Sequence, residues 1–338
     1  MRLNLSSMKA VIPIAGAGTS LRPHTFTQPK PLIPVAGKPI IFFIIDQLLS
    51  VGVNHFVFII GHLGDKLQME IERAYPNLTK SFILQIDRTG IAHAIWTAKA
   101  EFQDADQILI ALGDTIIDDN IQKFIDTEHS CFGVKKVQDP REFGIAEFND
   151  AGFVIRVIEK PKIPISNMAL VGLYKIKEVP ALLSAIEYNI ENNLKTHGEF
   201  QLTDAIMRMI EKKIKFEAIT VKNWFDCGKR EILLETNETL LKKYAVNNKT
   251  QRTFPNTIII PPVSIGENCN IKNSIIGPYV TIGNQAIIEK SIVSDSIIGD
   301  FSTIKSIILK RSIVGNDASI KGLSQSLNIG DNTEIDFS

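Results

Sequence analysis

The 338-residue chain has little of several features that would point to particular classes of protein. Its three cysteines, Cys131, Cys227 and Cys269, are far apart, odd in number and form no C-x-x-C pair. We therefore expect free thiols in a reducing cytoplasm rather than a disulfide framework. The formal net charge is zero, which removes the electrostatic argument for nucleic acid or an anionic membrane as a partner.

Long apolar runs are also missing. No stretch approaches the length of a membrane span, and the first seven residues, MRLNLSS, contain one arginine and no apolar core. Neither a transmembrane helix nor a signal peptide is therefore expected, and Met8 is an alternative candidate for the start. A hydrophobic content of 44% with 22% charged residues is ordinary for a soluble globular protein, and the length favours two domains.

Short apolar runs alternate with helical patterns from residue 8 to about residue 219. Continuous apolar strands separated by helices indicate a mostly parallel sheet covered on both faces, so we predict a Rossmann-like, doubly wound α/β fold with a mixed sheet. Ligands bind such sheets beyond the carboxyl ends of the strands. Three loops fall there: residues 16–19, the Gly113-Asp114 pair, and the loop that contains Gly90.

A different pattern starts at residue 258. An aliphatic residue followed by glycine recurs at Ile265-Gly266, Ile276-Gly277, Ile282-Gly283, Ile298-Gly299, Val314-Gly315 and Ile329-Gly330, and further aliphatic residues fall between these pairs at Ile271, Ile288, Ile304, Ile320 and Ile335. Most steps along this combined series are six residues long, and some are five. A near-hexad repeat predicts a parallel β-helix with stacked aliphatic side chains in its core, because the alternative, an antiparallel sandwich, keeps no fixed short period. The predicted domains are an α/β domain over residues 8–244, a linker over 245–257 and a β-helix over 258–338.

The loop after the first predicted strand is rich in glycine and is followed by cations. Glycines let backbone N–H groups approach an anion, although on its own a short G-x-G is more often a plain turn. Arg22, Lys30 and Lys38 then sit among five prolines that stiffen the segment. Together these features predict a polyphosphate site, with Ala15, Gly16, Ala17, Gly18, Thr19 and Ser20 as its nucleotide-binding loop.

The segment GAGTSLRPHTFTQPKPLIPVAGKP resembles the signature of the sugar-nucleotide pyrophosphorylases, which are nucleoside triphosphate:sugar-1-phosphate nucleotidyltransferases. The family pattern is G-x-G-T-R-L-x-P followed by P-K-x-L-x-P-V-x-x-K-P. The chain is most similar to the long-form glucose-1-phosphate thymidylyltransferases and their uridylyl relatives, whose tail is a left-handed β-helix, and the likeness covers nearly the whole chain after Met8. One position departs from the pattern, since Ser20 stands where the family carries arginine.

The resemblance implies a metal site at two aspartates. Asp114 closes LIALGD and Asp226 lies in NWFDCG, matching the family's L-G-D and W-x-D-x-G elements. Mg²⁺ takes hard oxygen ligands, usually one or two carboxylates together with waters and phosphates. Either aspartate alone could instead cap the next helix.

The same resemblance assigns the sugar phosphate to a second group of residues. Glu159 and Lys160 match the family's E-K-P element, in which the lysine binds the phosphate and the glutamate a sugar hydroxyl. Gly144, Asn167, Val171 and Gly172 match the family's sugar pocket. From the residues alone, a Glu-Lys pair at a strand end is more often a solvated face, and the other positions can be explained by strand packing.

The nucleobase is expected near Gln85 and Gly90, which keep the spacing of the family's base-reading glutamine. A glutamine amide can pair with the donor-acceptor edge of thymine or uracil. His93, three residues after Gly90, resembles the uridylyltransferase version of this motif. We nevertheless expect it to be a first-turn helix residue without a direct contact to the base.

The implied reaction is attack by a sugar-1-phosphate oxygen on the α-phosphorus of dTTP or UTP, with glucose-1-phosphate as the expected acceptor. Catalysis would consist of positioning and charge neutralisation by Mg²⁺, Lys30, Lys160 and loop amides. Because Ser20 removes a cation, we hypothesise that Arg22 supplies the missing charge, since residues i and i+2 of an extended loop point to the same side. The alternative is a catalytically weak or silent relative that binds sugar nucleotides and regulates a partner.

Two other enzymatic interpretations fit the sequence less well. An acyltransferase site in the β-helix would need a histidine base, and all six histidines precede residue 258. A dinucleotide-dependent dehydrogenase would need G-x-G-x-x-G opening a helix. The tail is therefore expected to be an oligomerisation module, giving a homo-oligomer through the β-helix.

Overall fold

The computed structural model describes residues 8–244 and 253–322, and in it the chain divides into two compact units. The first consists of the chain up to Ile33 together with Lys38–Leu233, and the second of Pro34–Gly37 and the chain from Leu234 onward. The predicted linker lies mostly outside the described residues, as do residues 1–7 and the last predicted repeat at Ile329-Gly330.

The first unit contains the predicted alternation of strands and helices. Its strands are β1 (Met8–Ile14), β3 (Lys38–Pro39), β4 (His55–Ile60), β5 (Thr79–Leu84), β6 (Gln107–Ala111), β7 (Thr115–Asp118), β8 (Ser130–Lys136), β9 (Gly144–Phe148), β10 (Val154–Glu159), β11 (Met168–Ile176), β12 (Phe216–Thr220) and β13 (Asn223–Asp226). Its helices are α1 (Ile40–Ser50), α2 (Gly64–Ala74), α3 (Ile91–Thr97), α4 (Gln122–Ile125), α5 (Val179–Glu191) and α6 (Leu202–Glu211), and the boundary between the units falls inside α7 (Arg230–Tyr244). Short 3-10 helices are η2 (Thr19–Leu21), η3 (His24–Phe26), η4 (Lys30–Leu32), η5 (Lys99–Glu101) and η6 (Pro140–Glu142).

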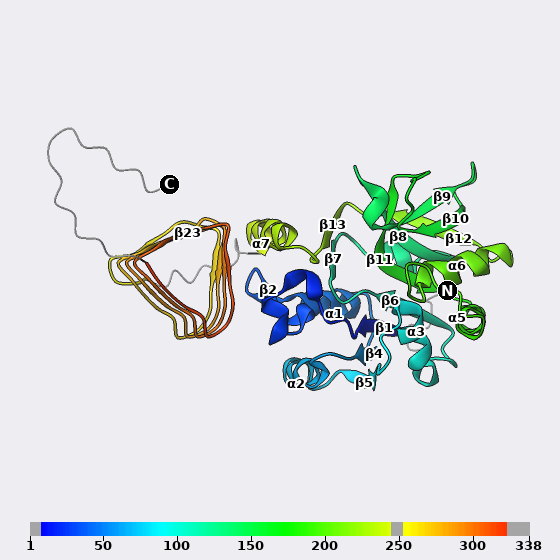
Figure 1. The fold of residues 1–338 in the computed structure, drawn as a ribbon, viewed down its shortest axis with the longest axis horizontal. Coiled ribbons are helices and arrows are strands. Elements are labelled where there is room, and N and C mark those ends of the chain that lie inside the picture. Colours follow the sequence, from blue (N-terminus) through cyan, green and yellow to red (C-terminus); the bar gives the residue numbers. More distant parts are fainter. Residues whose placement is uncertain (1–7, 245–252, 323–338) are drawn as a thin grey trace. The chain divides into compact units, whose positions relative to one another are not determined.

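Nine of these strands form one mixed sheet (Figure 1). The path runs β10-β9-β11-β6-β1-β4-β5, and β8 pairs with both β11 and β12. β1 is parallel to β4 and to β6, β4 is parallel to β5, and β11 is antiparallel to β6. The carboxyl ends of β5, β4, β1 and β6 therefore share one edge of the sheet, which is where the predicted ligand loops follow. The predicted α/β fold is confirmed.

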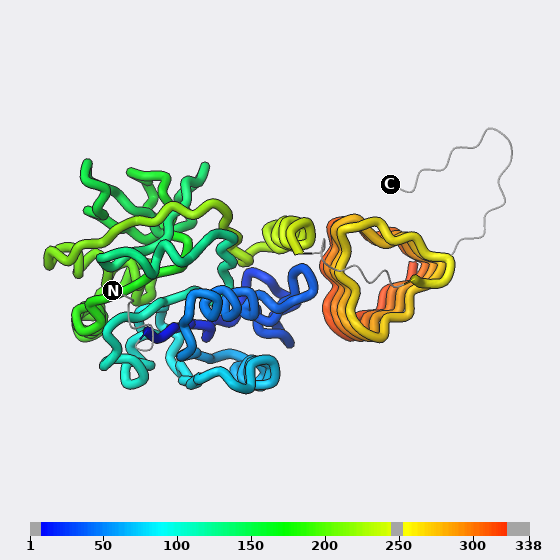
Figure 2. The backbone as a smooth tube through the Cα atoms, turned by 180° about the vertical axis from the view of Figure 1, so that it is seen from behind, coloured from blue at the N-terminus to red at the C-terminus, as the bar shows by residue number. Residues whose placement is uncertain are grey.

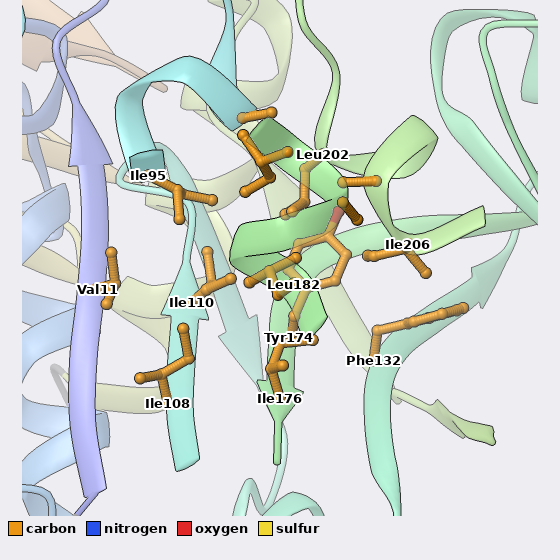
Figure 3. Packing of buried hydrophobic residues seen from close by; sticks show 14 of the residues in the cluster. Val11, Ile95, Ile108, Ile110, Phe132, Tyr174, Ile176, Leu182, Leu202 and Ile206 are labelled. Carbon is orange, nitrogen blue, oxygen red and sulfur yellow. The ribbon is translucent and has the colours of Figure 1, made fainter. Parts of the chain in front are cut away.

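Helices α3, α5 and α6 pack over one face of this sheet (Figure 3). Their buried side chains, such as Ile95, Leu182 and Ile206, contact a layer of strand residues that includes Val11 of β1. The residues on either side of Val11, Ala10 and Ile12, are fully buried as well. Since successive residues of a strand point to opposite faces, both faces of β1 are covered, as a doubly wound sheet requires.

The second unit contains a left-handed parallel β-helix whose coils lie one on the next (Figure 2). Its three sheets are built from β14 (Ile258–Ile259), β17 (Ile275–Ile276), β20 (Ile292–Ser294) and β23 (Ile308–Lys310); from β15 (Val263–Ile265), β18 (Val280–Ile282), β21 (Ile297–Ile298) and β24 (Ile313–Val314); and from β16 (Asn270–Lys272), β19 (Ile287–Glu289), β22 (Thr303–Lys305) and β25 (Ser319–Lys321). β2 (Pro34–Val35) also belongs to this unit. The predicted aliphatic positions, among them Ile271, Ile282, Ile288 and Ile298, form its core.

Register fixes the length of a coil. Ile258 pairs with Ile275, Ile275 with Ile292, and Ile292 with Ile308, so a coil takes 17 residues in the first two steps and 16 in the third. Three steps of five or six residues make up each coil, which explains the mixed spacing in the sequence.

Polar side chains accept backbone N–H groups at one corner of three successive coils. The Oδ1 atom of Asn284 accepts the backbone N–H of Glu267 at 2.8 Å, and Oδ1 of Asp300 accepts that of Asn284 at 2.7 Å. Oδ1 of Asn316 accepts the N–H of Asp300 at 2.9 Å. Each of these side chains hydrogen-bonds the backbone of the preceding coil, and this ladder accounts for the Asn or Asp that follows Gly283, Gly299 and Gly315.

No helix in the described part of the chain combines the length and the apolar composition that crossing a membrane requires.

Candidate active site

A cavity of about 510 Å³ lies at the shared edge where β1, β5 and β6 end. Its lining residues are Pro13, Ile14, Ala15, Gly16, Ala17, Gly18, Lys30, Pro31, Gln85, Arg88, Gly90, Ile91, Ala94, Leu112, Gly113, Asp114 and Glu199. The cavity thus unites the first four residues of the predicted nucleotide-binding loop with Lys30, Asp114, Gln85 and Gly90. Thr19, Ser20 and Arg22 do not line it.

The two glycines of the loop are required for different reasons. Gly18 has φ +61°, and a Cβ there would lie 3.0 Å from Cβ of Lys30 and from Cγ2 of Thr25. The Thr25 hydroxyl also donates to the carbonyl oxygen of Gly18 at 2.7 Å, so the fold itself needs glycine at 18. A Cβ on Gly16 would meet nothing within 4 Å. The protein leaves Gly16 open toward the cavity, which is the environment that a backbone approaching an anion needs.

Lys30, Asp114 and Asp226 come together from three separate segments. Nζ of Lys30 lies 2.5 Å from Oδ2 of Asp114. β13 pairs with β7 so that Asp226 is opposite Thr115, and the N–H of Cys227 donates to the carbonyl oxygen of Asp114 at 3.0 Å. The N–H of Gly228 donates to Oδ1 of Asp226 at 3.1 Å. Backbone pairing therefore holds the two predicted metal ligands side by side.

The charges in this cluster perturb one another. Burial raises the pKa of Asp226, and repulsion from Asp114 raises it further, against the opposing attraction of Lys30. Burial acts to lower the pKa of Lys30, but attraction to Asp114 and Asp226 outweighs it, and the pKa of Lys30 lies above its usual value. Attraction to both carboxylates therefore favours the charged form of the lysine.

The two carboxylates suit a magnesium ion better than a metal that takes all of its ligands from protein side chains. No group of three or more His, Cys, Asp or Glu side chains able to hold a metal occurs in residues 8–244 and 253–322. Asp114 and Asp226 supply two hard oxygen donors, and Mg²⁺ commonly completes its shell with waters and substrate phosphates.

Gln85 lies at the other end of the cavity. Its side chain is buried, and Nε2 donates to the carbonyl oxygen of Gly90 at 3.3 Å and lies 3.2 Å from Nδ1 of His93. Gly90 has φ +122°, and a Cβ there would clash with the carbonyl oxygen of Phe200. His93 is in the first turn of α3, as expected, but it also contacts the predicted base-reading glutamine.

Arg22 does not line the cavity. The expectation of an extended loop at residues 20–22 is wrong, because Thr19–Leu21 form the 3-10 helix η2. Arg22 is exposed, and its guanidinium carbon lies 4.9 Å from the centroid of the Phe26 ring. Its proposed role in catalysis stays a prediction.

Arg88 and Glu199 line the cavity although the sequence patterns did not single them out. Arg88 lies in the short connection between β5 and α3, and Glu199 precedes Phe200, whose N–H donates to the carbonyl oxygen of Thr89 at 2.8 Å. The sequence signal that could have placed Arg88 at the cavity is its position three residues after Gln85.

The predicted sugar-phosphate residues form a separate group. Gly144 and Glu159 are paired across β9 and β10, and a Cβ on Gly144 would lie 3.0 Å from Oε2 of Glu159. The hydroxyl of Thr203, which sequence reasoning missed, donates to the same Oε2 at 3.0 Å. Burial raises the pKa of Glu159, against the opposing effects of Thr203 and Lys160. The N–H of Lys160 donates to the carbonyl oxygen of Phe143 at 3.1 Å.

The remaining residues of the predicted sugar pocket lie in β11 or, in the case of Asn167, directly before it. Asn167 is exposed and its carbonyl oxygen accepts the N–H of Val137 at 3.0 Å, whereas Val171 is buried. The carbonyl oxygen of Gly172 accepts the N–H of Leu112 at 2.9 Å. Gly172 therefore supports the turn that precedes Asp114, but neither it, Asn167 nor Val171 lines the cavity.

Comparison with known proteins identifies the family. The sequence profile of the family described as "Nucleotidyl transferase" matches residues 9–243, more than half of the chain. The low-salt glycan biosynthesis nucleotidyltransferase Agl11 of Haloferax volcanii is 34% identical over 250 residues, which cover 72% of this chain and 68% of that protein. A glucose-1-phosphate thymidylyltransferase of Streptomyces antibioticus is 30% identical over 306 residues, covering 88% of this chain and 82% of that protein.

A solved structure agrees with these matches. The putative glucose-1-phosphate thymidylyltransferase of Bacillus anthracis superposes with a TM-score of 0.59 at 27% identity, and the match covers 69% of this chain and 94% of that one. Taken with the sheet topology and the clustered lysine and aspartates, these findings confirm the predicted family resemblance: the chain belongs to the nucleotidyl transferase family of enzymes.

Proposed function

We propose that this protein transfers a nucleotidyl group from dTTP or UTP to a hexose-1-phosphate, with glucose-1-phosphate as the favoured acceptor, and releases pyrophosphate. The convergence of Lys30, Asp114 and Asp226 beside the open loop around Gly16 carries this proposal. Two of the relatives are named glucose-1-phosphate thymidylyltransferase, which supports dTTP and glucose-1-phosphate as substrates.

The proposed chemistry needs no protein nucleophile. An anionic phosphate oxygen of the sugar-1-phosphate attacks the α-phosphorus, a new P–O bond forms, and the bond from the α-phosphorus to the bridging oxygen breaks as pyrophosphate leaves in line. Asp114 and Asp226 would hold Mg²⁺, which when bound neutralises phosphate charge. Lys30 and the loop amides orient the triphosphate, and Lys160 positions the attacking sugar phosphate.

Two separate groups of residues would select the two substrates, one the nucleobase and the other the sugar. Gln85 presents an amide to the nucleobase and is itself positioned by Gly90 and His93. Glu159, whose carboxylate accepts a hydrogen bond from Thr203, would accept another from a sugar hydroxyl beside Gly144. The family resemblance adds Asn167, Val171 and Gly172 to the proposed sugar site.

The silent-relative alternative rests on Ser20 alone. Lys30 is paired with Asp114, and Asp226 adds a second carboxylate close enough to attract the lysine, which is the set of charges that a metal-assisted phosphoryl transfer uses. The retained cluster of Lys30, Asp114 and Asp226 favours catalysis.

We also propose that the protein forms a homo-oligomer through its β-helix. Ile258, Ile275, Ile292 and Ile308 occupy the same outward position on successive coils of the β14-β17-β20-β23 sheet. Ile258, Ile292 and Ile308 are 60%, 39% and 73% exposed. A continuous aliphatic column on a sheet face is the kind of surface that self-association covers.

Pyrophosphate release over a grid of nucleoside triphosphates and hexose-1-phosphates tests the proposed reaction. We expect turnover with dTTP or UTP and glucose-1-phosphate in the presence of Mg²⁺, and its loss in Lys30→Gln. The matched control is Lys212→Gln, which removes the same charge from an exposed residue at the end of α6. A folded wild-type protein that releases no pyrophosphate with any pair would contradict the proposal.

A further inference from the structure

The charges that line the cavity do not suffice for a triphosphate. Its cationic side chains are Lys30 and Arg88, and its anionic side chains are Asp114 and Glu199, so their formal charges cancel. Lys30 is already paired with Asp114. A nucleoside triphosphate adds several negative charges, which must be met by metal, by loop amides and by any cation that remains available.

The other cations of the glycine- and proline-rich loop are occupied by neighbours within the protein. Arg22 packs on the ring of Phe26, and Lys38 forms an ion pair with Asp46. Neither residue lines the cavity. Ser20, where the family pattern has arginine, is exposed and does not line it either.

Arg88 differs from Arg22 and Lys38 both in its position at the cavity and in its lack of a partner within the described residues. It lines the cavity, and within residues 8–244 and 253–322 it makes no hydrogen bond, ion pair or ring contact. It lies in the connection that follows β5, at the same sheet edge as the loop after β1. A guanidinium carries a permanent charge and a rigid fork of donors that suits phosphate oxygens.

We propose that Arg88 binds the phosphates of the nucleotide and supplies the positive charge that Ser20 does not. This inference rests on the proposed function, because it assigns one further ligand-binding residue to the same site. It also explains how a chain without arginine at position 20 neutralises its substrate.

The competing role for Arg88 is stacking on the nucleobase, since Gln85 lies three residues earlier. The two roles are separated by a probe that has phosphates but no base. We therefore propose to titrate the wild-type protein and Arg88→Gln with tripolyphosphate in the presence of Mg²⁺ by calorimetry, and separately with thymidine and uridine. The matched control is Arg73→Gln on α2, which removes the same charge from an exposed residue paired with Glu70.

Loss of one charge-assisted contact is expected to weaken tripolyphosphate binding by roughly 10- to 100-fold in Arg88→Gln. Arg73→Gln should bind like the wild type. Unchanged tripolyphosphate affinity in Arg88→Gln would overturn the inference, whether or not nucleoside binding falls. This titration does not require turnover, so it decides the role of Arg88 even if the proposed reaction is wrong.

A rescue experiment tests the link to position 20. In an enzyme that turns over, kcat/KM for the nucleotide should fall roughly 10- to 100-fold in Arg88→Gln, and Ser20→Arg combined with Arg88→Gln should recover at least part of that loss. A double variant no more active than Arg88→Gln would overturn the compensation. So would the opposite pattern, in which Arg22→Gln loses activity and Arg88→Gln does not.

Discussion

Nζ of Lys30 lies 2.5 Å from Oδ2 of Asp114, across 84 residues of sequence. The lysine comes from η4, in the proline-rich loop, and the aspartate from the turn between β6 and β7. The pair brings a positive charge to the position where a metal ion would meet the same carboxylate. If Asp114 holds the metal ion as proposed, Lys30 would have two effects: it would stabilise the cluster without metal, and it would compete with the cation for Asp114.

The competition gives a first prediction. Lys30→Gln removes the competing charge, so we expect Mn²⁺, used as a probe for Mg²⁺, to bind several-fold more tightly in the absence of nucleotide. Pyrophosphate release should nevertheless fall by on the order of 10²-fold or more, because the same lysine orients the triphosphate. Weaker Mn²⁺ binding by the variant would show that Lys30 does not compete with the metal.

The raised pKa of Asp226 predicts how metal stabilisation depends on pH. Because the folded state holds this proton more tightly than the unfolded chain, its contribution to stability is present at low pH and is lost as the pH rises through the raised pKa. Divalent metal binds the deprotonated carboxylate. The increase in Tm caused by Mg²⁺ should therefore grow as the pH rises through the raised pKa of Asp226.

Asp226→Asn is the control for this measurement. Its carboxamide does not titrate, so the Tm increment should be small and should lack the part of the pH dependence that belongs to Asp226. An increment with the same pH dependence in both proteins would assign the effect to other groups.

The two loop glycines allow binding to be separated from folding. A Cβ on Gly16 meets nothing within 4 Å, so Gly16→Ala should leave the free energy of unfolding within about 0.5 kcal/mol of wild type. Nucleotide affinity should fall roughly tenfold, because the methyl group occupies space that the anion needs. Gly18→Ala, strained at φ +61° and crowded by Lys30 and Thr25, should destabilise the fold by roughly 1–3 kcal/mol. If Gly16→Ala bound nucleotide normally, the open face of this glycine would have no role in binding.

The aliphatic column on the β-helix predicts the effect of a charge on assembly. Ile308→Lys places a cation on the most exposed of the four isoleucines, and light scattering should detect a smaller species than the wild type at the same concentration. Ser319→Lys adds the same charge on the β16-β19-β22-β25 sheet and should leave the mass unchanged. An equal mass for the wild type and Ile308→Lys would exclude this face as the interface.

Features governed by local pattern could be predicted from the sequence. The apolar runs predicted the strands of the sheet, the near-hexad spacing predicted the core of the β-helix, and the turn glycines located the loops at the sheet edge. Only the family motifs allowed Asp114 and Asp226 to be predicted as neighbours from the sequence. Their proximity depends on the β7–β13 pairing, which no local pattern encodes.

Features governed by tertiary contacts could not be predicted in this way. Arg22 was selected by assuming an extended loop, but a 3-10 helix changes the direction of its side chain and Phe26 offers it a surface. Arg88 belongs to no periodic pattern, and only the position of its loop in space brings it to the cavity. Thr203 meets Glu159 across 44 residues, and the isoleucine column required knowledge of the coil length.

The most direct test of the central claim measures whether Asp114 and Asp226 act on one metal–nucleotide complex. Mn²⁺ affinity can be followed by electron paramagnetic resonance in the presence of a dTTP analogue with a non-cleavable α,β-bridge. We predict that Asp114→Asn and Asp226→Asn each weaken Mn²⁺ binding by at least about tenfold, and that the double variant loses little more than either single variant. Independent, additive losses, or no loss in one of the single variants, would contradict a shared ion.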